Sequence, residues 1–392
     1  MSLGRRFQNS RTPRLIVGEK ALLSLPDLLK EAEVRSICLV GGGASFDRIA
    51  LSEELLATIS HQGIRVELFR HSGEPSPESV DRAVELIREQ DLQAVVGVGG
   101  GSTIDLAKAA AAVAEEEGPT IDYLEGVGSR KPAGRRLPLF AAPTTAGTGS
   151  EATKNAVLSR IGEKGFKKSL RHEAFIPDVA ILDPAAAVSC PREVTAASGL
   201  DAITQLLEAY VSTAANPFTD CLAAEGLRKA GWSFERVLED PQDLQAREAM
   251  ALAAYYSGVC LANAGLGFVH GAASPIGAMR PVPHGTFCGL TLCPSVEETL
   301  PLLDPHDRAG SEALRKYHAA AGFLSPEASD SSEVPDIVNR LRRLAKAAAL
   351  PTLKSFGFTR EDLEKVAAEA GVKNHPADLD LDTKVRILTA AL

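Results

Sequence analysis

Three consecutive glycines and a serine, residues 99–102, come directly after the apolar run 94–98 and directly before a stretch that favours a helix. Glycines let the backbone approach an anion closely, and the free N–H groups and dipole of a helix N-terminus attract it. We therefore predict that this segment holds a phosphate group. A tight turn that uses glycine only for its backbone angles is the simpler alternative, but such a turn does not require three glycines and a serine.

A second loop rich in hydroxyl groups, residues 143–151, follows another apolar run. Its threonines can hydrogen-bond a ribose, an amide or a phosphate, although hydroxyl-rich surface loops have the same composition. The glycine run matches neither the Gly-x-Gly-x-x-Gly fingerprint of dinucleotide sites nor the Gly-Lys-Ser/Thr end of a Walker loop. Residue chemistry alone thus indicates a phosphate site without identifying the rest of the ligand.

A carboxylate and two histidines form a third group whose side chains could take part in chemistry. Asp201 and Gln205 are four residues apart in a helical pattern, which places both on one face. His270 and His284 lie farther along the chain, in segments rich in glycine and proline. Imidazoles with a carboxylate suit a divalent metal such as Zn²⁺ or Fe²⁺. A single histidine is more often a hydrogen-bonding structural residue than a ligand, and spacing alone does not join the two.

Strands that alternate with helices are expected to position these groups. Apolar runs bounded by turn residues predict strands at 36–40, 65–69, 94–98, 138–142 and 179–182. Helical periods separate several of them, as at 79–90, and such alternation predicts a parallel, doubly wound sheet. Almost every later segment has a helical pattern. The later helices are predicted at 196–212, 219–229, 243–264, 311–321, 334–348 and 360–370.

The change of pattern near Pro184 predicts two domains. We expect a dinucleotide-binding α/β domain over residues 1–184 and an all-helical metal and substrate domain over residues 185–392, with the active site between them. A chain of 392 residues is long enough to bury two cores.

Composition narrows the classes of partner. The formal net charge of −9 argues against a nucleic-acid surface and favours small metabolites. The N-terminus lacks the apolar segment of a signal peptide, and no run is long enough for a membrane span, so we expect a cytoplasmic protein with no membrane partner. The six cysteines form no Cys-x-x-Cys pair and are predicted to be reduced, mostly buried thiols.

From about Val17 to the C-terminus, the chain resembles the iron-containing, group III alcohol dehydrogenase family. Each motif that carries the likeness is weak alone, and their order along the chain makes the resemblance specific. The motifs are Gly-Gly-Gly-Ser-x-x-Asp-x-x-Lys (99–108), Pro-Thr-Thr-Ala-Gly-Thr-Gly-Ser-Glu (143–151), Gly-Leu-Asp-Ala (199–202), Glu-Ala-Tyr-Val-Ser with Asn-Pro-x-Thr-Asp (208–220), His270, and Pro-His-Gly (283–285).

The resemblance implies a Rossmann-like parallel-sheet domain followed by an all-α domain, as in the dehydroquinate synthase-like fold. It implies an NAD(P)-dependent alcohol dehydrogenase, a homodimer, that interconverts a small alcohol and its aldehyde or ketone by metal-assisted hydride transfer. Asp105 and Lys108 are expected to orient the glycine turn and its helix. The implied cofactor-binding residues are Gly42, Gly99, Gly100, Gly101, Ser102, Asp105, Thr144, Thr145 and Thr148.

Two positions depart from the family's metal pattern, in which an Asp is followed four residues later by a His and then by two more histidines. Asp201, His270 and His284 match the pattern and are the implied catalytic ligands. Gln205 stands where the second ligand is expected, and its neutral amide oxygen is a poorer donor than imidazole, so retention and identity of the metal stay open. Ser274 stands where a further histidine is common, which puts a proton path through that position in doubt.

The choice between NAD and NADP is open as well. NAD-preferring enzymes of this type often carry an Asp after the strand predicted at 36–40, where its carboxylate holds the adenosine 2′-OH and repels a 2′-phosphate. This chain has Gly42 in a run of three glycines there. Without the carboxylate, NADP is not excluded.

The sequence alone leaves two other functions open. The first is a same-fold enzyme of the glycerol-1-phosphate dehydrogenase or dehydroquinate synthase kind, in which Lys167, Lys168 and Arg171 would bind a phosphorylated or carboxylated substrate. The second is a catalytically silent nucleotide-binding protein, which the missing histidines favour. No motif identifies the substrate.

Overall fold

A six-stranded sheet forms the centre of the N-terminal domain, and all of its strand pairs are parallel. The computed structural model describes residues 6–162, 165–325 and 336–392. The strand order is β1-β8-β5-β4-β2-β3. The strands are β1 (Arg14–Val17), β2 (Ser36–Gly42), β3 (Arg65–His71), β4 (Ala94–Gly99), β5 (Leu139–Pro143) and β8 (Val179–Leu182).

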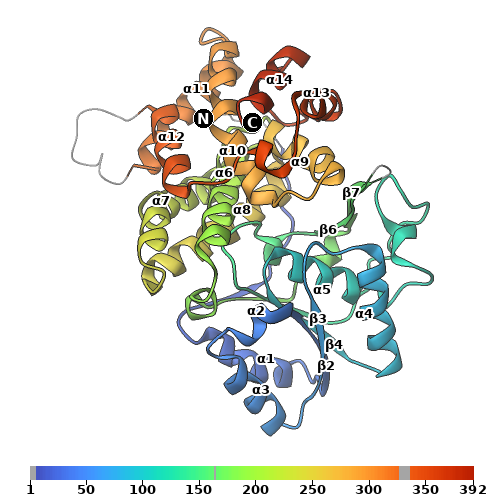
Figure 1. Ribbon diagram of the computed structural model, residues 1–392. Helices are drawn as coiled ribbons and strands as arrows, with labels where there is room; N and C mark the ends of the chain where they lie inside the picture. Colours follow the sequence, from blue (N-terminus) through green and yellow to red (C-terminus); the bar gives the residue numbers. More distant parts are fainter. Residues whose placement is uncertain (1–5, 163–164, 326–335) are drawn as a thin grey trace.

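Helices cover both faces of this sheet (Figure 1). Apolar side chains of α4 and α5 pack on one face, and those of α1 and α3 pack on the other. The central strands β4 and β5 are buried along their whole length, as strands between two helical layers must be. The doubly wound sheet predicted from the sequence is therefore confirmed. The helices are α1 (Leu25–Glu31), α2 (Gly43–Asp47), α3 (Ser52–His61), α4 (Pro77–Glu89) and α5 (Gly101–Val113).

Three strands were not expected from the sequence. β1 is a short edge strand of only four residues, and an antiparallel hairpin of β6 (Asn155–Arg160) and β7 (Phe166–Arg171) lies outside the main sheet. β7 is rich in charged residues and mostly only half-buried, so it lacks the apolar run by which the other strands were predicted. The five predicted strands are all present, with no end shifted by more than two residues.

After β8 the described residues form helices and no further strand. The predicted helices correspond to α6, α7, α8, α11, α12 and α13, and the predicted start of α12, at residues 334–335, lies outside the described residues. No single described helix could cross a membrane, although α8 and α9 together, bent by 98° at their junction, have a suitable length and composition. The helices are α6 (Arg192–Val211), α7 (Pro217–Glu239), α8 (Leu244–Ala264), α9 (Phe268–Met279), α10 (His284–Thr299), α11 (Arg308–Phe323), α12 (Ile337–Ala348), α13 (Arg360–Glu369) and α14 (Leu381–Thr389).

Helices α9 and α10 form although each contains a proline, Pro275 or Pro294, which disfavours a helix interior. Tertiary packing outweighs this preference, because Phe268 and Phe287 are fully buried in a core shared with α13 and α14. Gly285 allows the first turn of α10 to reach α6, since a Cβ there would lie 2.3 Å from the carbonyl oxygen of Ala197. This contact brings two of the helices with predicted site residues side by side.

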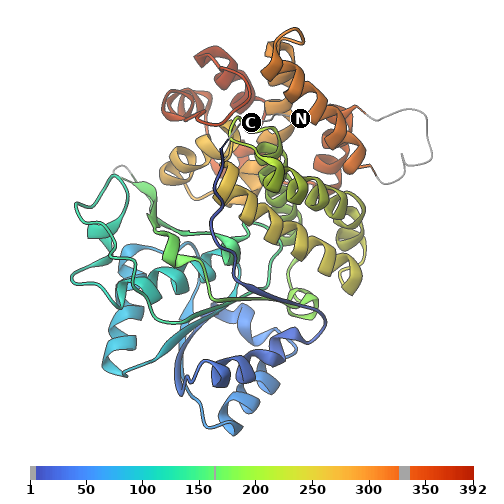
Figure 2. The same ribbon diagram turned by 180° about the vertical axis from the view of Figure 1, so that it is seen from behind.

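The two domains are joined by more than the chain between β8 and α6. In Figure 2 the N-terminal segment, coloured dark blue, runs from the helical domain down to the sheet. Along this path the N–H of Ser10 donates a hydrogen bond of 2.7 Å to Oδ1 of Asn263 on α8. The loop after β5 is the second connection and carries the predicted threonines.

Candidate nucleotide and metal sites

The predicted phosphate cradle lies where β4 passes into α5. β4 ends at Gly99, and Gly100 is the N-cap residue of α5. Because Gly100 has no side chain, no side-chain hydrogen bond caps the helix. No carboxylate is present in that turn, which contains Gly101 and Ser102. The first N–H groups of a helix have no partner within the helix, so this uncapped, uncharged end suits an anion.

Other predicted cofactor residues converge on the same edge of the sheet. A Cβ on Gly42, at the end of β2, would lie 3.9 Å from the Cα of Gly99. The N–H of Thr144 donates a hydrogen bond of 2.9 Å to the carbonyl oxygen of Gly99. β2 and β4 are neighbours although β3 comes between them in sequence, and ligands of open α/β sheets bind at such a reversal of strand order.

The threonine loop closes over the glycine turn. A Cβ on Gly101 would lie 2.5 Å from Oγ1 of Thr148, and one on Gly100 would lie 3.5 Å from the side chain of Thr145. Glycine is needed at Gly101 because the loop leaves no space for a side chain there. The structure thus brings together the two loops that the sequence singled out separately.

Lys108 and Asp105 lie under the turn. The fully buried Lys108 ammonium donates to the carbonyl oxygens of Ser150 and Asn155 at 2.7 Å each and lies 3.5 Å from Asp105. The Asp105 carboxylate also accepts bonds from the Ser150 hydroxyl and, at 3.1 Å, from the N–H of Val157. Burial raises the pKa of Asp105 and lowers that of Lys108, while each charge opposes the shift of the other. The pair ties α5 to the loop and to β6, consistent with an orienting role.

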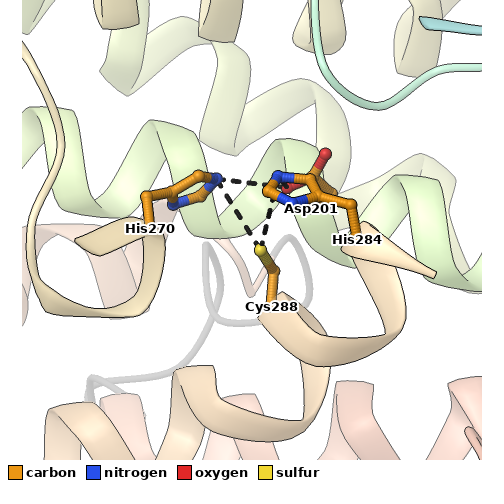
Figure 3. Close-up of side chains that lie close together, drawn as sticks. All are labelled: Asp201, His270, His284 and Cys288. Atoms are coloured by element: carbon orange, nitrogen blue, oxygen red, sulfur yellow. Dashed lines mark hydrogen bonds and ion pairs between the residues drawn. The ribbon is translucent and has the colours of Figure 1, made fainter. Parts of the chain in front are cut away.

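The predicted metal ligands also come together, from three different helices. Oδ1 of Asp201 on α6 lies 3.3 Å from Nε2 of His270 on α9 and 3.5 Å from Nε2 of His284 on α10. Figure 3 shows both imidazoles directed at the Asp201 carboxylate. The Asp201 side chain is 2% exposed and that of His284 is 26% exposed, so the cluster is reached from the His284 side.

Glu208, which the sequence analysis did not assign, fixes the orientation of His270. One of its oxygens lies 2.7 Å from Nδ1 of His270, and the other accepts a hydrogen bond of 2.8 Å from the N–H of Val269. This leaves Nε2 of His270 facing the cluster, as carboxylates behind metal-bound histidines commonly do. Glu208 follows Asp201 by seven residues on α6, a spacing that places both on one helix face and could have indicated it.

Gln205 has a free acceptor inside the protein. Its Nε2 faces two acceptors, Oδ2 of Asp201 and the carbonyl oxygen of Gly147, each at 3.5 Å, which directs Oε1 elsewhere. Oε1 is buried, and no described residue donates a hydrogen bond to it. A buried acceptor without a donor is unfavourable, and with the amide rotated by 180° a cation beside Asp201 would satisfy it. The residues present therefore fit a metal.

The electrostatics of the cluster favour a cation as well. Burial opposes charge on Asp201, but His284 and His270 outweigh it and lower the pKa of its carboxyl group. Burial opposes charge on His270 too, yet Cys288, Asp201 and Glu208 raise its pKa well above the ordinary value. For His284, burial dominates and lowers the pKa to about 4. One imidazolium therefore leaves part of the negative charge of the two buried carboxylates uncompensated, whereas a divalent ion in place of its proton would match both charges.

Cys288 is a fourth member that spacing motifs did not reveal. Its Sγ lies 3.7 Å from Nε2 of His270 and 3.7 Å from Nε2 of His284. It follows His284 by four residues on α10, the one signal that could have found it. Burial raises the pKa of its thiol to about 12 in the absence of a metal. Ser274, one turn after His270, is exposed and is not part of this cluster.

The loop at 143–151 reaches both sites. Besides its contacts with the glycine turn, its Gly147 carbonyl oxygen accepts bonds from Gln205 and, at 3.3 Å, from the hydroxyl of Ser257 on α8. A cavity beside the loop is lined by residues of both domains. Among the lining residues are Thr145, Ala146, Thr195, Ser198 and Met250. The glycine turn and the cluster around Asp201 are therefore connected through one short segment.

Two of the three cations suggested for binding a phosphorylated substrate already form ion pairs within the protein. The Lys167 ammonium forms an ion pair with Glu74, and Arg171 lies 3.5 Å from Glu125. Lys168 is exposed on β7. Lys167, whose charge acts on His284, is thus neutralised by its pairing with Glu74.

Comparison with known proteins places the chain in a family. Residues 12–184 match the model for iron-containing alcohol dehydrogenases, and residues 195–392 match the model for the C-terminal part of the Fe-containing alcohol dehydrogenase family. Alcohol dehydrogenase 4 of Saccharomyces cerevisiae (strain YJM789) is 35% identical over 361 residues, which cover 91% of this chain and 90% of that protein. The NAD-dependent methanol dehydrogenase of Bacillus methanolicus is 32% identical over 361 residues, covering 91% of each.

The solved structures agree with this assignment. A crystal structure of 1,3-propanediol oxidoreductase is similar with a TM-score of 0.87 and 26% sequence identity, over 99% of this chain and 100% of that one. With both halves matched in order and the fold shared end to end, this chain belongs to the iron-containing alcohol dehydrogenase family.

Proposed function

We propose that this protein interconverts a small alcohol and its aldehyde or ketone by metal-assisted hydride transfer, with Asp201, His270, His284 and Gln205 as metal ligands. Family membership makes it an oxidoreductase that acts on CH–OH groups and uses a nicotinamide cofactor and a divalent metal. The observation that carries the assignment of the site is the loop at 143–151, which contacts the glycine turn at one end and Gln205 near its middle.

In the proposed reaction each group of the chain has a distinct role. When bound, the metal supplies Lewis-acid polarisation of the substrate oxygen, and the nicotinamide ring exchanges the hydride. The turn at 99–102 binds the pyrophosphate through backbone N–H groups, and Thr144, Thr145 and Thr148 bind the ribose side. Glu208 holds the Nδ1–H of His270 so that Nε2 is presented as a donor.

The cofactor preference follows from the end of β2. Gly42 brings no carboxylate to the position where one would repel a 2′-phosphate. We propose that the protein accepts NADP as well as NAD. We further propose that the nucleotide domain spans residues 1–184 and the metal and substrate domain spans residues 185–392. The protein is proposed to be a cytoplasmic homodimer with Fe²⁺ or Zn²⁺ as its metal.

Removal of the metal tests the function. Protein treated with a chelator should lose the ability to reduce NAD⁺ or NADP⁺ with a panel of short alcohols, and anaerobic addition of Zn²⁺ or Fe²⁺ should restore it. Full turnover by metal-free protein would contradict the metal's role. Binding of metal and nucleotide without turnover of any alcohol or aldehyde would instead identify a silent nucleotide-binding protein.

A matched pair of variants places the metal. Asp201→Asn should lower kcat/KM by roughly 100-fold or more, because loss of a ligand should weaken the site at least as much as loss of an outer-shell partner does. Asp382→Asn, on an exposed position of α14, is the control and should retain the parent rate. Equal rates in the two variants would argue that Asp201 is not a ligand.

A further inference from the structure

Cys288 lies at the distances that a shared metal ion requires. Atoms bound at about 2.0–2.3 Å to one tetrahedral ion lie roughly 3.3–3.7 Å apart. The Sγ of Cys288 is 3.7 Å from Nε2 of both His270 and His284. Both nitrogens lie within the same range of Oδ1 of Asp201, at 3.3 Å and 3.5 Å. All four ligand atoms fall within 4.8 Å of one another (Figure 3).

The fold holds this sulfur in place. Cys288 is fully buried on α10, one turn after His284 and on the same face. Gly289 allows this part of α10 to pack against α6, since a Cβ there would lie 2.7 Å from Cδ1 of Leu200. Because α6 also carries Asp201, the thiol and the carboxylate are set by two helices in direct contact.

Ordinary burial of a cysteine does not explain this arrangement. Cys293 is also buried on α10, but its Sγ faces the carbonyl oxygen of Val338 at 3.7 Å. The buried Cys260 similarly faces the carbonyl oxygen of Thr219 at 3.5 Å. Among the described residues, only Cys288 contributes a thiol to a cluster of possible metal ligands.

We infer that Cys288, in place of Gln205, is the fourth ligand of the metal as a thiolate, so that a carboxylate, two imidazoles and a sulfur hold the ion and favour Zn²⁺ over Fe²⁺. This inference rests on the proposed metal-dependent function. Gln205 is neutral where the family pattern has imidazole, and its Nε2, not its unpartnered Oε1, is the amide atom that faces Asp201. As the Zn–S bond forms, the thiol proton leaves to solvent. Two anionic ligands then balance the charge of the ion, and soft thiolate donors select Zn²⁺.

X-ray absorption at the zinc edge tests the inference on the zinc-loaded, full-length protein. The spectrum should require one sulfur at about 2.3 Å in addition to nitrogen and oxygen at about 2.0–2.1 Å. Cys288→Ser should lose the sulfur, while Cys293→Ser on the same helix should keep it. With Co²⁺ in place of zinc, the wild type and Cys293→Ser should show a thiolate-to-cobalt charge-transfer band that Cys288→Ser lacks.

The metal preference gives a second readout. The ratio of Zn²⁺ to Fe²⁺ affinity should fall in Cys288→Ser and stay unchanged in Cys293→Ser. Zinc bound only by nitrogen and oxygen in the wild type would overturn the inference and leave the metal-dependent function intact. Failure of the protein to bind zinc or cobalt at all would overturn both. The wild-type spectrum decides the question even if Cys288→Ser does not fold.

Discussion

Glu208 lies outside the proposed ligand set and orients one of its members. Its two carboxylate oxygens accept from two donors at once, the Nδ1 side of His270 and the N–H of Val269. The side chain is nearly buried, so neither bond is replaced easily by water. The position of the His270 ring, and with it the direction of Nε2, therefore depends on this carboxylate.

Replacement of Glu208 by Gln is expected to weaken zinc binding by about 10–100-fold. The amide has one acceptor oxygen for two donors, so either the ring or the backbone of Val269 loses its partner. Competition with a chromophoric chelator measures the affinity. Glu193→Gln, at an exposed position on α6, should bind zinc as the parent does, and equal affinities of the two variants would remove the positioning role of Glu208.

Glu151, at the end of the threonine loop, is expected to make stability depend on pH. Burial raises the pKa of its carboxyl group from 4.5 to about 7. Between these values the folded protein retains a proton that the unfolded chain has released. The free energy of unfolding should therefore fall as pH rises through this window, by up to about 3 kcal/mol, and level off above it.

The variant Glu151→Gln should abolish that fall, since its amide mimics the protonated acid at every pH. Urea unfolding of metal-free and cofactor-free protein, from about pH 5 to about pH 8, measures the effect. Glu89→Gln, exposed at the end of α4, should keep the parent profile. Parallel pH profiles for the parent and Glu151→Gln would contradict the assignment.

At the scale of elements, the joint between the threonine loop and α8 depends on two glycines. A Cβ on Gly258 would lie 2.2 Å from the carbonyl oxygen of Gly149, and one on Gly149 would lie 2.3 Å from that of Ala254. These contacts are with backbone, which cannot move aside as a flexible side chain can. The loop that contacts both sites is therefore fixed by close backbone packing on the helical domain.

Gly258→Ala should separate the loop from α8 and lower the free energy of unfolding by about 1–3 kcal/mol. Because the same loop contacts the glycine turn, the Kd for NADH should rise as well. Thermal unfolding and nicotinamide fluorescence measure the two effects. Gly322→Ala on α11, where an added Cβ meets nothing within 4 Å, should be neutral or slightly stabilising. If Gly258→Ala instead behaved like Gly322→Ala, the contact between the loop and α8 would tolerate an added Cβ, which would contradict this prediction.

The strands that the sequence predicted most clearly are those whose burial on both faces requires a continuous run of apolar residues. β4 and β5 are buried on both faces and were visible as apolar runs, whereas β1 and the β6–β7 hairpin are short, exposed or charged and lack a clear period. Helices α9 and α10 contain glycines and prolines, so local preference argued against them, and only packing against the neighbouring helices forms them.

At the scale of the whole molecule, the two proposed sites belong to different domains. The glycine turn lies on the sheet, and Asp201, His270 and His284 lie on three helices of the second domain. The sequence indicated the residue types, and helical spacing grouped Asp201 with Gln205. Neighbours across helices, such as Cys288 beside His270, follow only from tertiary packing, so no period in the sequence could reveal them.

Transfer of deuterium tests metal-assisted hydride transfer most directly. The zinc-loaded protein is mixed with NAD⁺ or NADP⁺ and a small alcohol deuterated at its carbinol carbon, and the reduced cofactor is analysed by mass spectrometry. We predict that the nicotinamide ring carries the deuterium, and that chelator-treated protein transfers none. Reduced cofactor without deuterium, or equal transfer by metal-free protein, would contradict the proposed reaction.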